Sequence, residues 1–386
     1  MNIIINASNL CVGGGVQVAL SFINELNKIS VENNYHVFAS KAILEQIDCS
    51  IFSNKFRFYS ISQSPARIIT RSKTIKFLSR LEEKIAPDVV FTVFGPSYWR
   101  PKSPHVMGFA NGWLYNPKSI AYTKLTLANK IRMKAFCWYQ AYYLKRDAFN
   151  FIVETHDAKE KLQKVLSVEE DKIAVVGNTC SSIFYDIKYT KRSCEHYTKL
   201  PKKENNEYRL LYITHNHPSK NLEIINKVCE LLSEKNINFV VTIDSKSYKN
   251  MFSNNPRVMN LGPVAHESCP SIYNQCDFLF APTLLETFSA SYPESMKMGL
   301  PILTSKYSFA VDVCHNSALY FDPLEPKDIA EKINTIIDNP NLQKTMVNNG
   351  KTVLSKMETG RTRAEKYLRI CDRVSKKTIG VVDVQK

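Results

Sequence analysis

The chain has 386 residues, of which 44% are hydrophobic and 23% charged, so we expect a globular protein long enough for two domains. It holds no apolar run long enough to predict a transmembrane helix. The first residues, MNIIINASNL, are expected to form a strand rather than a signal peptide. The ten cysteines form neither a CxxC pair nor a zinc-type cluster, which favours reduced thiols in a cytosolic protein.

The net charge of +15 is unevenly distributed. Between Lys55 and Arg146 there are seventeen Lys and Arg against three acids, so this stretch carries nearly all of the excess. Such a stretch is expected to attract an anionic surface or substrate.

Short apolar runs alternate with segments of helical periodicity in the first half of the chain. The pattern predicts strands over 2–7, 35–40, 55–61, 88–94, 151–155 and 172–178, and helices over 15–29, 65–85, 119–147 and 157–166. This alternation is typical of a parallel sheet covered by helices. We therefore expect residues 1–185 to form a Rossmann-like domain.

A polar, charged segment over 186–208 is interpreted as an interdomain linker, and the alternation restarts after it. We expect residues 209–360 to form a second Rossmann-like domain, with a C-terminal helix in about 361–386 that packs back on the first. The elements predicted after the linker are strands over 209–215, 237–244, 257–264, 276–283 and 300–305, and helices over 219–235, 267–275, 292–298, 326–338, 340–356 and 361–376. The predicted fold class is thus α/β, with two tandem domains facing a cleft. Ligands of open α/β sheets bind beyond the carboxyl ends of the strands.

Three motifs follow predicted strands. Gly13, Gly14 and Gly15 open a helix, where glycines let backbone N–H groups approach a phosphate. The motif is not GxGxxG, which argues against NAD, and a tight turn without a ligand is the alternative. After the strand at 209–215 come His215, Asn216, His217 and Lys220, a set that suits an anionic diphosphate. A solvated lysine is the alternative there, and no third metal ligand is evident nearby.

The third motif is LLETFSASYPESMKMGLPILTS, residues 284–305. Glu286 directly follows an apolar strand, the loop Thr287–Ser289 comes next, and Glu294 lies one turn into a helix. Two acids in this arrangement are suited to accept hydrogen bonds from two sets of hydroxyls. The alternative, ordinary acids of a surface helix, does not explain an acid just after a fully apolar strand.

At these residues the chain resembles the retaining nucleotide-sugar glycosyltransferases of family 4, which have the two-domain GT-B fold. The shared pattern is Glu286, seven residues, Glu294, and then Gly299 and Pro301 before an apolar strand. The resemblance is strong over 209–340 and weaker over 1–185. It implies that Glu286 contacts the donor sugar and that Lys220 neutralises the leaving diphosphate.

The resemblance also implies a set of donor-binding residues. Glu294 would hold the ribose, backbone N–H groups would bind sugar and phosphate, and residues 262–264 would face the nucleobase. The set comprises Gly14, Gly15, His215, Asn216, Val264, Thr287, Phe288, Ser289 and Glu294. We expect no metal and no cofactor, because Lys220 and helix N-termini take the charge and no Asp-x-Asp triplet is present; the donor substrate would be a UDP- or GDP-sugar.

Two positions depart from the family pattern. Many members have an Arg a few residues before the lysine, where this chain has THNHPSK (214–220). Many also have a His-Asp pair in the first domain, where Ala110 and Asn111 stand here. Without the Arg, His215 or Asn216 is expected to take its place beside the phosphate. Without the His-Asp pair, no catalytic histidine is expected in the first domain, and the acceptor is expected to be bound differently.

The basic region 64–146 includes residues 118–146, with seven bases, no acid and several aromatic residues. A basic, aromatic-rich helix suits the surface of an anionic membrane. We therefore expect a cytoplasmic enzyme, peripheral on the inner face of the membrane, which extends a lipid-linked glycan in bacterial O-antigen or capsule synthesis. A solvated basic surface, or aromatics that belong to the core, are the alternatives for this region. For the whole chain the alternatives are a nucleotide-sugar epimerase of similar fold and, from charge alone, a nucleic-acid-binding protein that lacks any recognisable binding module.

Overall fold

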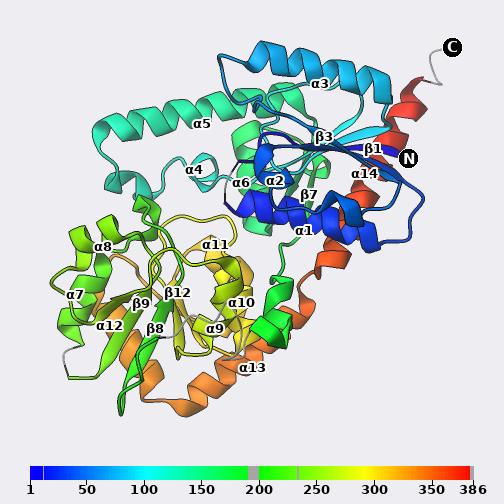
Figure 1. The fold of residues 1–386 in the computed structure, drawn as a ribbon. Coiled ribbons are helices and arrows are strands. Elements are labelled where there is room, and N and C mark those ends of the chain that lie inside the picture. Colours follow the sequence, from blue (N-terminus) through cyan, green and yellow to red (C-terminus); the bar gives the residue numbers. More distant parts are fainter. Residues whose placement is uncertain (12, 190–199, 233, 383–386) are drawn as a thin grey trace. The chain divides into compact units, whose positions relative to one another are not determined.

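The computed structural model describes residues 1–11, 13–189, 200–232 and 234–382. They form two compact α/β units (Figure 1). Unit 1 comprises Met1–Pro117, Ile131–Gly177 and the residues from Glu358 on, and unit 2 comprises Lys118–Lys130 and Asn178–Met357. A segment of the first half of the sequence therefore belongs to unit 2.

Unit 1 is built on a seven-stranded parallel sheet with the order β3-β2-β1-β4-β5-β6-β7. The order runs outward in both directions from β1 and β4, so the switch point of this sheet lies between those two strands. The strands are β1 Asn2–Ala7, β2 Asn34–Ala39, β3 Phe56–Ser60, β4 Val89–Thr92, β5 His105–Gly108, β6 Asn150–Val153 and β7 Ile173–Val175.

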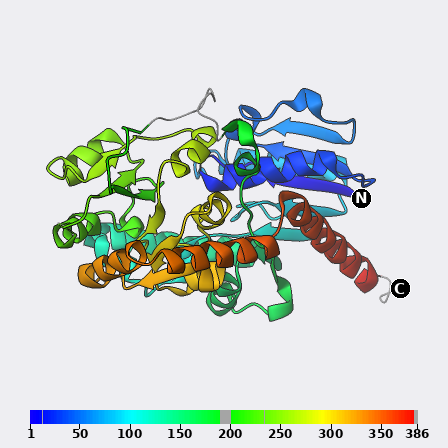
Figure 2. The same ribbon diagram turned by 90° about the horizontal axis from the view of Figure 1, so that it is seen from below.

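Helices cover both faces of this sheet because successive side chains of a strand point to opposite sides. Ile3 and Ile5 of β1 pack in one cluster with α1 and α14, whereas Ile4 packs in another with Leu78 of α3. Helix α14 lies against α1 and β4 (Figure 2). The helices are α1 Gly14–Lys28, α2 Lys41–Leu44, η1 Cys49–Ile51, α3 Arg71–Ile85, α4 Gly112–Tyr115, α5 Leu127–Asp147, α6 His156–Leu166, η3 Glu170–Lys172 and α14 Gly360–Val382.

Unit 2 is built on a six-stranded parallel sheet with the order β10-β9-β8-β11-β12-β13. Its central strand β11 is apolar and at most 2% exposed at every residue, as expected for a strand covered on both faces. The strands are β8 Tyr208–Tyr212, β9 Ile237–Val241, β10 Val258–Asn260, β11 Phe278–Ala281, β12 Ile302–Ser305 and β13 Ala318–Phe321.

The helices of unit 2 are η2 Ile120–Lys124, η4 Ser182–Tyr185, η5 Ile187–Tyr189, η6 Pro218–Lys220, α7 Ile224–Leu231, α8 Ser245–Phe252, η7 His266–Ser268, α9 Cys269–Tyr273, α10 Ser291–Met298, α11 Ser308–Cys314, η8 His315–Ser317, α12 Pro326–Ile337 and α13 Pro340–Lys356. The α-helices among them, together with η4, share one hydrophobic core with this sheet.

The predicted fold class of two tandem α/β, Rossmann-like domains is confirmed, since both sheets are parallel and covered by helices. Several details differ from the prediction. The strands β5 and β13 and the helices α2, α4, α8 and α11 were not expected, and the helix predicted over 119–147 is interrupted. It is interrupted because Ser119 caps the short helix η2 and Leu125, which ends η2, has extended backbone, so that α5 begins only at Leu127.

The chain passes from unit 1 to unit 2 between Gly177 and Asn178, before the predicted linker. Phe184 of η4 already packs in the core of unit 2. Residues 190–199 of the predicted linker lie outside the described residues, and residues 200–207 lead into β8.

Candidate active site

The candidate site lies at the carboxyl ends of two central strands of unit 2. β8 and β11 are paired neighbours, although β9 and β10 come between them in the sequence. They therefore flank the switch point of the strand order, where the loops of an open α/β sheet diverge and leave room for a ligand. The loop after β8 leads to Lys220, and the loop after β11 leads to Glu286.

Lys220 and Glu286, which were predicted from separate motifs, form an ion pair. The Nζ of Lys220 donates a hydrogen bond to the Oε2 of Glu286. Their side chains are 16% and 22% exposed, so the pair is largely shielded but still reachable from solvent. The structure thus brings together the two residues to which catalytic roles were assigned.

The Lys220 side chain is held as a cation. Burial lowers its pKa, but the charge of Glu286, together with Tyr212 and the hydrogen bond to Glu286, outweighs this effect and raises the pKa above the ordinary value. A lysine in this setting stays protonated across the physiological pH range. It therefore offers a permanent charge to an anionic ligand.

The turn that carries Lys220 is fastened to the loop after β11. The Leu284 N–H donates to the Ser219 carbonyl at 2.7 Å. The Tyr212 hydroxyl donates to the Lys220 carbonyl at 3.2 Å, and it lies 2.7 Å from the Thr283 hydroxyl, which can donate to it in turn. These bonds fix the two loops with respect to each other, so the geometry of the Lys220–Glu286 pair is set without a ligand.

The polar residues before Lys220 have different surroundings. His217 caps η6, because its Nδ1 accepts from the Ser219 N–H at 3.3 Å. Asn216 donates from Nδ2 to the Ser247 hydroxyl at 2.9 Å. Part of the His215 side chain reaches solvent, and its partial desolvation, followed by the charge of Lys220, lowers its pKa below the ordinary value. Of the three, His215 and Asn216 keep the predicted donor-binding role as a prediction, and His217 has a structural role.

The loop Thr287–Ser289 links β11 to α10 and is half-buried. The Phe288 side chain packs against the core of unit 2, and the Ser289 carbonyl accepts from the Tyr292 N–H at 3.2 Å. The backbone N–H groups of Thr287, Phe288 and Ser289 donate no hydrogen bond to any residue that the structure describes. Three available donors next to Glu286 suit an anionic or hydroxyl-bearing ligand.

Glu294 lies in the first turn of α10 and is only 7% exposed. Its Oε2 accepts from the Tyr273 hydroxyl at 3.0 Å. Burial raises the pKa of Glu294 to about 7, and the Tyr273 hydrogen bond opposes this shift. The second glutamate of the motif is therefore more enclosed than the sequence suggested, and one of its oxygens already has a partner.

Val264 lies after the edge strand β10, which is separated from β8 by β9. Gly262, before it, has a left-handed φ of 71°, and its N–H donates to the Asn260 side chain at 3.1 Å. The turn therefore needs glycine for its conformation. The predicted contact between the nucleobase and Val264 stays a prediction.

Gly14 and Gly15 belong to unit 1, at the start of α1 after β1. Gly13, which precedes the helix, has a left-handed φ of 77°. A Cβ at Gly14 would meet no atom within 4 Å, whereas one at Gly15 would lie 3.4 Å from Leu10 and 3.5 Å from Phe94. These glycines sit at the switch point of their own sheet, and their role in donor binding stays a prediction.

A segment of the first half of the chain supports the Lys220 turn. In the part of unit 2 formed by Lys118–Lys130, η2 packs against η6, and Ala121 and Tyr122 are at most 3% exposed. Lys124 forms an ion pair with Glu223, with 2.6 Å between Nζ and Oε1. Sequence reasoning placed this segment in a long helix and so missed that it reaches the candidate site.

Asn111, one of the two residues that stand where many family members have a His-Asp pair, has a structural role in unit 1. Asn111 caps α4 by accepting from the Trp113 N–H at 3.0 Å, and its amide donates to Gln140 of α5 at 2.5 Å. Both ends of the Asn111 side chain are therefore engaged. Nothing in these contacts gives Asn111 the part of a catalytic base.

A buried polar chain crosses the sheet of unit 1. His105 on β5 is 7% exposed, with its Nδ1 2.6 Å from the Asp147 carbonyl and its Nε2 2.8 Å from the Thr92 hydroxyl. Asn6 donates to the same hydroxyl at 3.1 Å. A carbonyl can only accept, so Nδ1 carries the proton and Nε2 accepts from Thr92. Burial lowers the pKa of His105 to about 4, against the effect of the Asp147 carbonyl, which keeps the ring neutral.

Other observations concern metal binding, membrane crossing and a hollow in unit 2. Within the described residues, no group of three or more His, Cys, Asp and Glu is arranged to hold a metal ion. No helix in the same part of the chain is both long and apolar enough to cross a bilayer.

An open hollow of about 620 Å³ in unit 2 is lined by Tyr208, Phe278 and Pro301 with residues of α13, at the amino ends of the strands. Because sheets of this kind bind ligands at the carboxyl ends, we do not assign the donor to it.

Sequence reasoning missed several groups that shape the site. Tyr212, Thr283 and Tyr273 hold the Lys220 turn and Glu294 through their hydroxyls. No signal in the sequence identifies them, because a tyrosine or threonine in an apolar segment has the same pattern as an ordinary core residue.

Part of the chain is similar to known glycosyltransferases. Residues 195–353, less than half of the chain, match the family model described as "Glycosyl transferases group 1". An uncharacterized glycosyltransferase of Methanocaldococcus jannaschii is 26% identical over 141 residues, which is 35% of this chain and 39% of that protein. The capsular polysaccharide biosynthesis glycosyltransferase CapM of Staphylococcus aureus is 25% identical over 247 residues, 61% of each chain. The chain thus covers less than two thirds of the length of either curated relative.

Two solved structures share the fold over nearly the whole chain. The Anabaena protein HepE, in complex with UDP-glucose, has a TM-score of 0.70 at 13% identity, covering 97% of this chain and all of the other. The UDP-GlcNAc 2-epimerase of Neisseria meningitidis, bound to UDP-GlcNAc, has a TM-score of 0.56 at 15% identity, covering 95% and 98%. The predicted glycosyltransferase class is supported over residues 195–353 by the family match, and the structural likeness extends the fold to the rest.

Proposed function

We propose that the chain is a retaining glycosyltransferase of family 4 that takes a sugar from a nucleotide-sugar donor. The observation that carries the proposal is the Lys220–Glu286 pair at the switch point of the unit 2 sheet. It sets a permanent cation beside a carboxylate at the place where this fold accepts ligands. The match of residues 195–353 to group 1 glycosyl transferases supports it independently.

Lys220 would stabilise the charge that develops on the leaving diphosphate. The donor would give Lys220 a second anionic partner, which releases Glu286 to accept hydrogen bonds from the sugar hydroxyls. The N–H groups of Thr287–Ser289, which have no partner among the described residues, and the positive end of α10 would share the phosphate charge. Retention of configuration requires the acceptor on the same face as the departing diphosphate, and charge stabilisation plus orientation would supply the rate.

Glu294 would receive the ribose hydroxyls in its ionised form. Its pKa of about 7 without a donor means that a large part of it is protonated at neutral pH. Hydroxyls that donate to the carboxylate would favour the charged form, so donor binding and proton release are linked. We propose that transfer itself needs no metal ion, in which case a chelator would leave the rate unchanged.

The donor is proposed to be a UDP- or GDP-sugar, which is supported by UDP-glucose in HepE. The acceptor is proposed to be a lipid-linked glycan of capsule or O-antigen synthesis, supported by the name of CapM. An enzyme with a membrane-anchored acceptor would work as a peripheral protein on the inner face of the cytoplasmic membrane, docked through the basic region 64–146.

A nucleotide-sugar epimerase is the second candidate, because the Neisseria meningitidis epimerase shares the fold. Epimerisation needs groups in the first domain that move protons, and His105 is committed to an internal hydrogen-bonded chain. NMR of a nucleotide sugar incubated with the protein and no acceptor separates the two. An epimer that accumulates would favour the second candidate.

Binding is tested with a thermal-shift screen of UDP- and GDP-sugars. A ligand that binds only the folded protein raises the melting temperature. Lys220→Ala is expected to remove the shift, whereas Lys227→Ala, an exposed lysine on the neighbouring helix α7, is expected to keep it. A shift that survives Lys220→Ala would contradict the assignment of the diphosphate site.

A further inference from the structure

The outward side of α5 presents apolar residues to solvent. Ile131, Trp138 and Tyr142 are 62%, 74% and 53% exposed. Their spacings of seven and four residues place them within about 40° of one another around the helix. The fully buried residues of α5, which are Gln140, Leu144 and Asp147, lie on the opposite side. Large apolar side chains opposite a helix's own packing face mark a surface built to be covered.

The same side of α5 is positively charged. Lys134 and Lys145 lie between or next to the apolar residues at helical spacing, and residues 118–146 contain seven bases and no acid. The one acid of α5, Asp147, is 2% exposed and accepts from the Arg146 Nε at 2.5 Å. No exposed carboxylate of α5 therefore offsets this charge.

A second apolar element lies in a loop that is tied to α5 through Tyr143, about 100° or more around the helix from Ile131, Trp138 and Tyr142. In the loop before α3, Ile68 is 77% exposed and Ile69 is 98% exposed. Arg71 ties that loop to α5, since its Nε donates to the Pro65 carbonyl at 2.8 Å and its Nη1 donates to the Tyr143 hydroxyl at 2.7 Å. Arg71 also lies over the Tyr143 ring at 5.1 Å.

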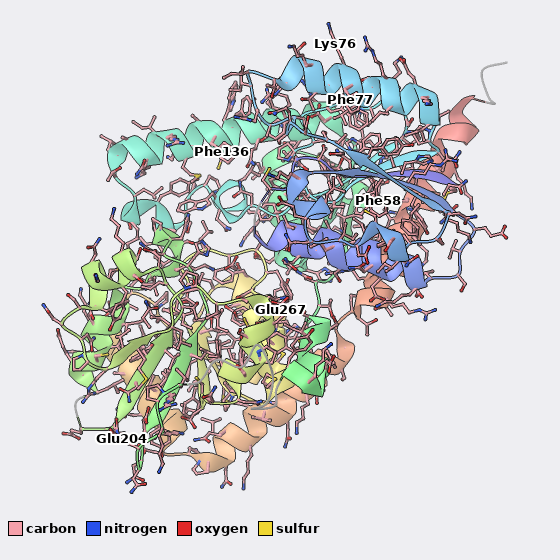
Figure 3. All side chains as sticks on the ribbon, in the orientation of Figure 1. Phe58, Lys76, Phe77, Phe136, Glu204 and Glu267 are labelled. Atoms are coloured by element: carbon pink, nitrogen blue, oxygen red, sulfur yellow. The ribbon has the colours of Figure 1, made fainter. Side chains whose placement is uncertain are left out.

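The helix that follows the Ile68–Ile69 loop also carries exposed basic residues, Lys73, Lys76 and Arg80. On α3, Lys76 projects away from the sheet of unit 1 (Figure 3). Lysines of this kind extend an ammonium beyond the apolar side chains beside them. Apolar tips set in a basic surface have the chemistry of a protein segment that lies in the interface of an anionic bilayer.

We infer that Ile68, Ile69, Ile131, Trp138 and Tyr142, called here the interfacial surface, insert into the headgroup region of an anionic membrane. This inference deepens the membrane docking of the proposed function and rests on it. The apolar side chains enter the acyl boundary while the lysines meet lipid phosphates, two contributions that add. The net positive charge argues against a second copy as the occupant, because two such surfaces repel each other.

Tryptophan fluorescence tests the inference directly. The chain has three tryptophans, and Trp99 and Trp113 are at most 9% exposed, so Trp138 is the one whose surroundings change when the surface is covered. With vesicles of phosphatidylcholine and phosphatidylglycerol, the emission is expected to shift to the blue and to be quenched by lipids brominated on the acyl chain. Vesicles of phosphatidylcholine alone are expected to give a much smaller shift. Trp138→Phe should abolish the shift and leave the protein folded.

A matched pair of variants tests insertion by co-sedimentation. Ile131 and Ile51 are the same residue type with 62% and 61% exposure, and only Ile131 belongs to the interfacial surface. Ile131→Gln is expected to lower the partition coefficient about tenfold, as the loss of one partly buried aliphatic side chain implies, while Ile51→Gln leaves it unchanged.

The outcomes separate this inference from the proposed function. Binding to anionic vesicles with no shift of the Trp138 emission, and with equal effects of the two isoleucine variants, would overturn insertion but leave charge-driven docking. No binding to any vesicle would overturn both the insertion and the charge-driven docking. A blue shift that grows with protein concentration in the absence of lipid would show self-association in place of a membrane, and a shift produced by an oligonucleotide but not by vesicles would show a nucleic-acid surface.

Discussion

Replacement of Glu294 by glutamine should make unit 2 less sensitive to alkaline pH. The side chain is 7% exposed, and burial raises its pKa from 4.5 to about 7. Glutamine has nearly the same shape, and its carbonyl oxygen can accept the hydrogen bond of the Tyr273 hydroxyl in place of Oε2. The substitution therefore removes a titrating group from the interior without opening a cavity.

The sign and size follow from the shift. A carboxyl with a raised pKa binds its proton more tightly in the folded state, so its ionisation destabilises the folded protein. The cost is fully present above pH 7, falls as the pH decreases, and is absent below pH 4.5. The difference between the two pKa values corresponds to about 3 kcal/mol in the free energy of unfolding.

Urea unfolding of the wild type and of Glu294→Gln, at about pH 8 and at about pH 5, measures this difference. The variant should gain about 2.5 kcal/mol relative to the wild type between the acidic and the alkaline condition, because all other titrating groups are common to both proteins. A free-energy difference between the two proteins that is the same at both pH values would refute the placement of Glu294 in a desolvated site.

Three further predictions concern other parts of the fold. Unit 1 should lose about 3 kcal/mol in the free energy of unfolding as the pH falls from 6.5 to about 4, because the folded protein holds His105 neutral and this contribution is complete only above pH 6.5. An acid titration of the wild type and of His105→Asn, whose side chain does not ionise, should show a smaller loss in the variant. Lys124→Glu should raise the donor KM a few-fold with little change in kcat, since the Lys124–Glu223 ion pair is partly exposed and contributes about 0.5 kcal/mol. Adding Glu223→Lys should restore the wild-type KM, and the control Lys130→Glu should leave the KM unchanged. Donor affinity should increase between about pH 6 and pH 8 in the wild type, as Glu294 ionises near pH 7, and calorimetry should find this increase missing in Glu294→Gln.

The sequence was most informative where burial and periodicity agree. The residues of β11 are apolar throughout because both faces of that strand are covered, so the strand and the acid after it could be recognised together. Strand β5, His105–Gly108, went unpredicted because a histidine begins it and a glycine ends it, so it shows no uninterrupted apolar run. The predicted helix over 119–147 placed Ala121 and Tyr122 in the first domain, since nothing in the composition of that segment reveals that they are buried residues of unit 2.

The residues of the candidate site could be predicted one by one, but the contacts between them could not. Lys220 and Glu286 are 66 residues apart, and their contact depends on the pairing of β8 with β11, which skips two strands. Strand order arises from packing of the whole unit and is not written in either motif. The same holds for the hydroxyl of Tyr273, whose bond to Glu294 depends on how α9 packs against α10.

The central claim is that Glu286 acts on the donor sugar beside Lys220, and a transfer assay of one matched pair tests it most directly. Release of nucleoside diphosphate would be measured with the nucleotide sugar that gives the largest thermal shift and a glycolipid acceptor in anionic vesicles, for Glu286→Ala and for Glu331→Ala on the exposed side of α12. The account predicts that Glu286→Ala lowers the rate by at least about a hundredfold while the protein stays folded, and that Glu331→Ala keeps the wild-type rate. Full activity of folded Glu286→Ala would contradict it.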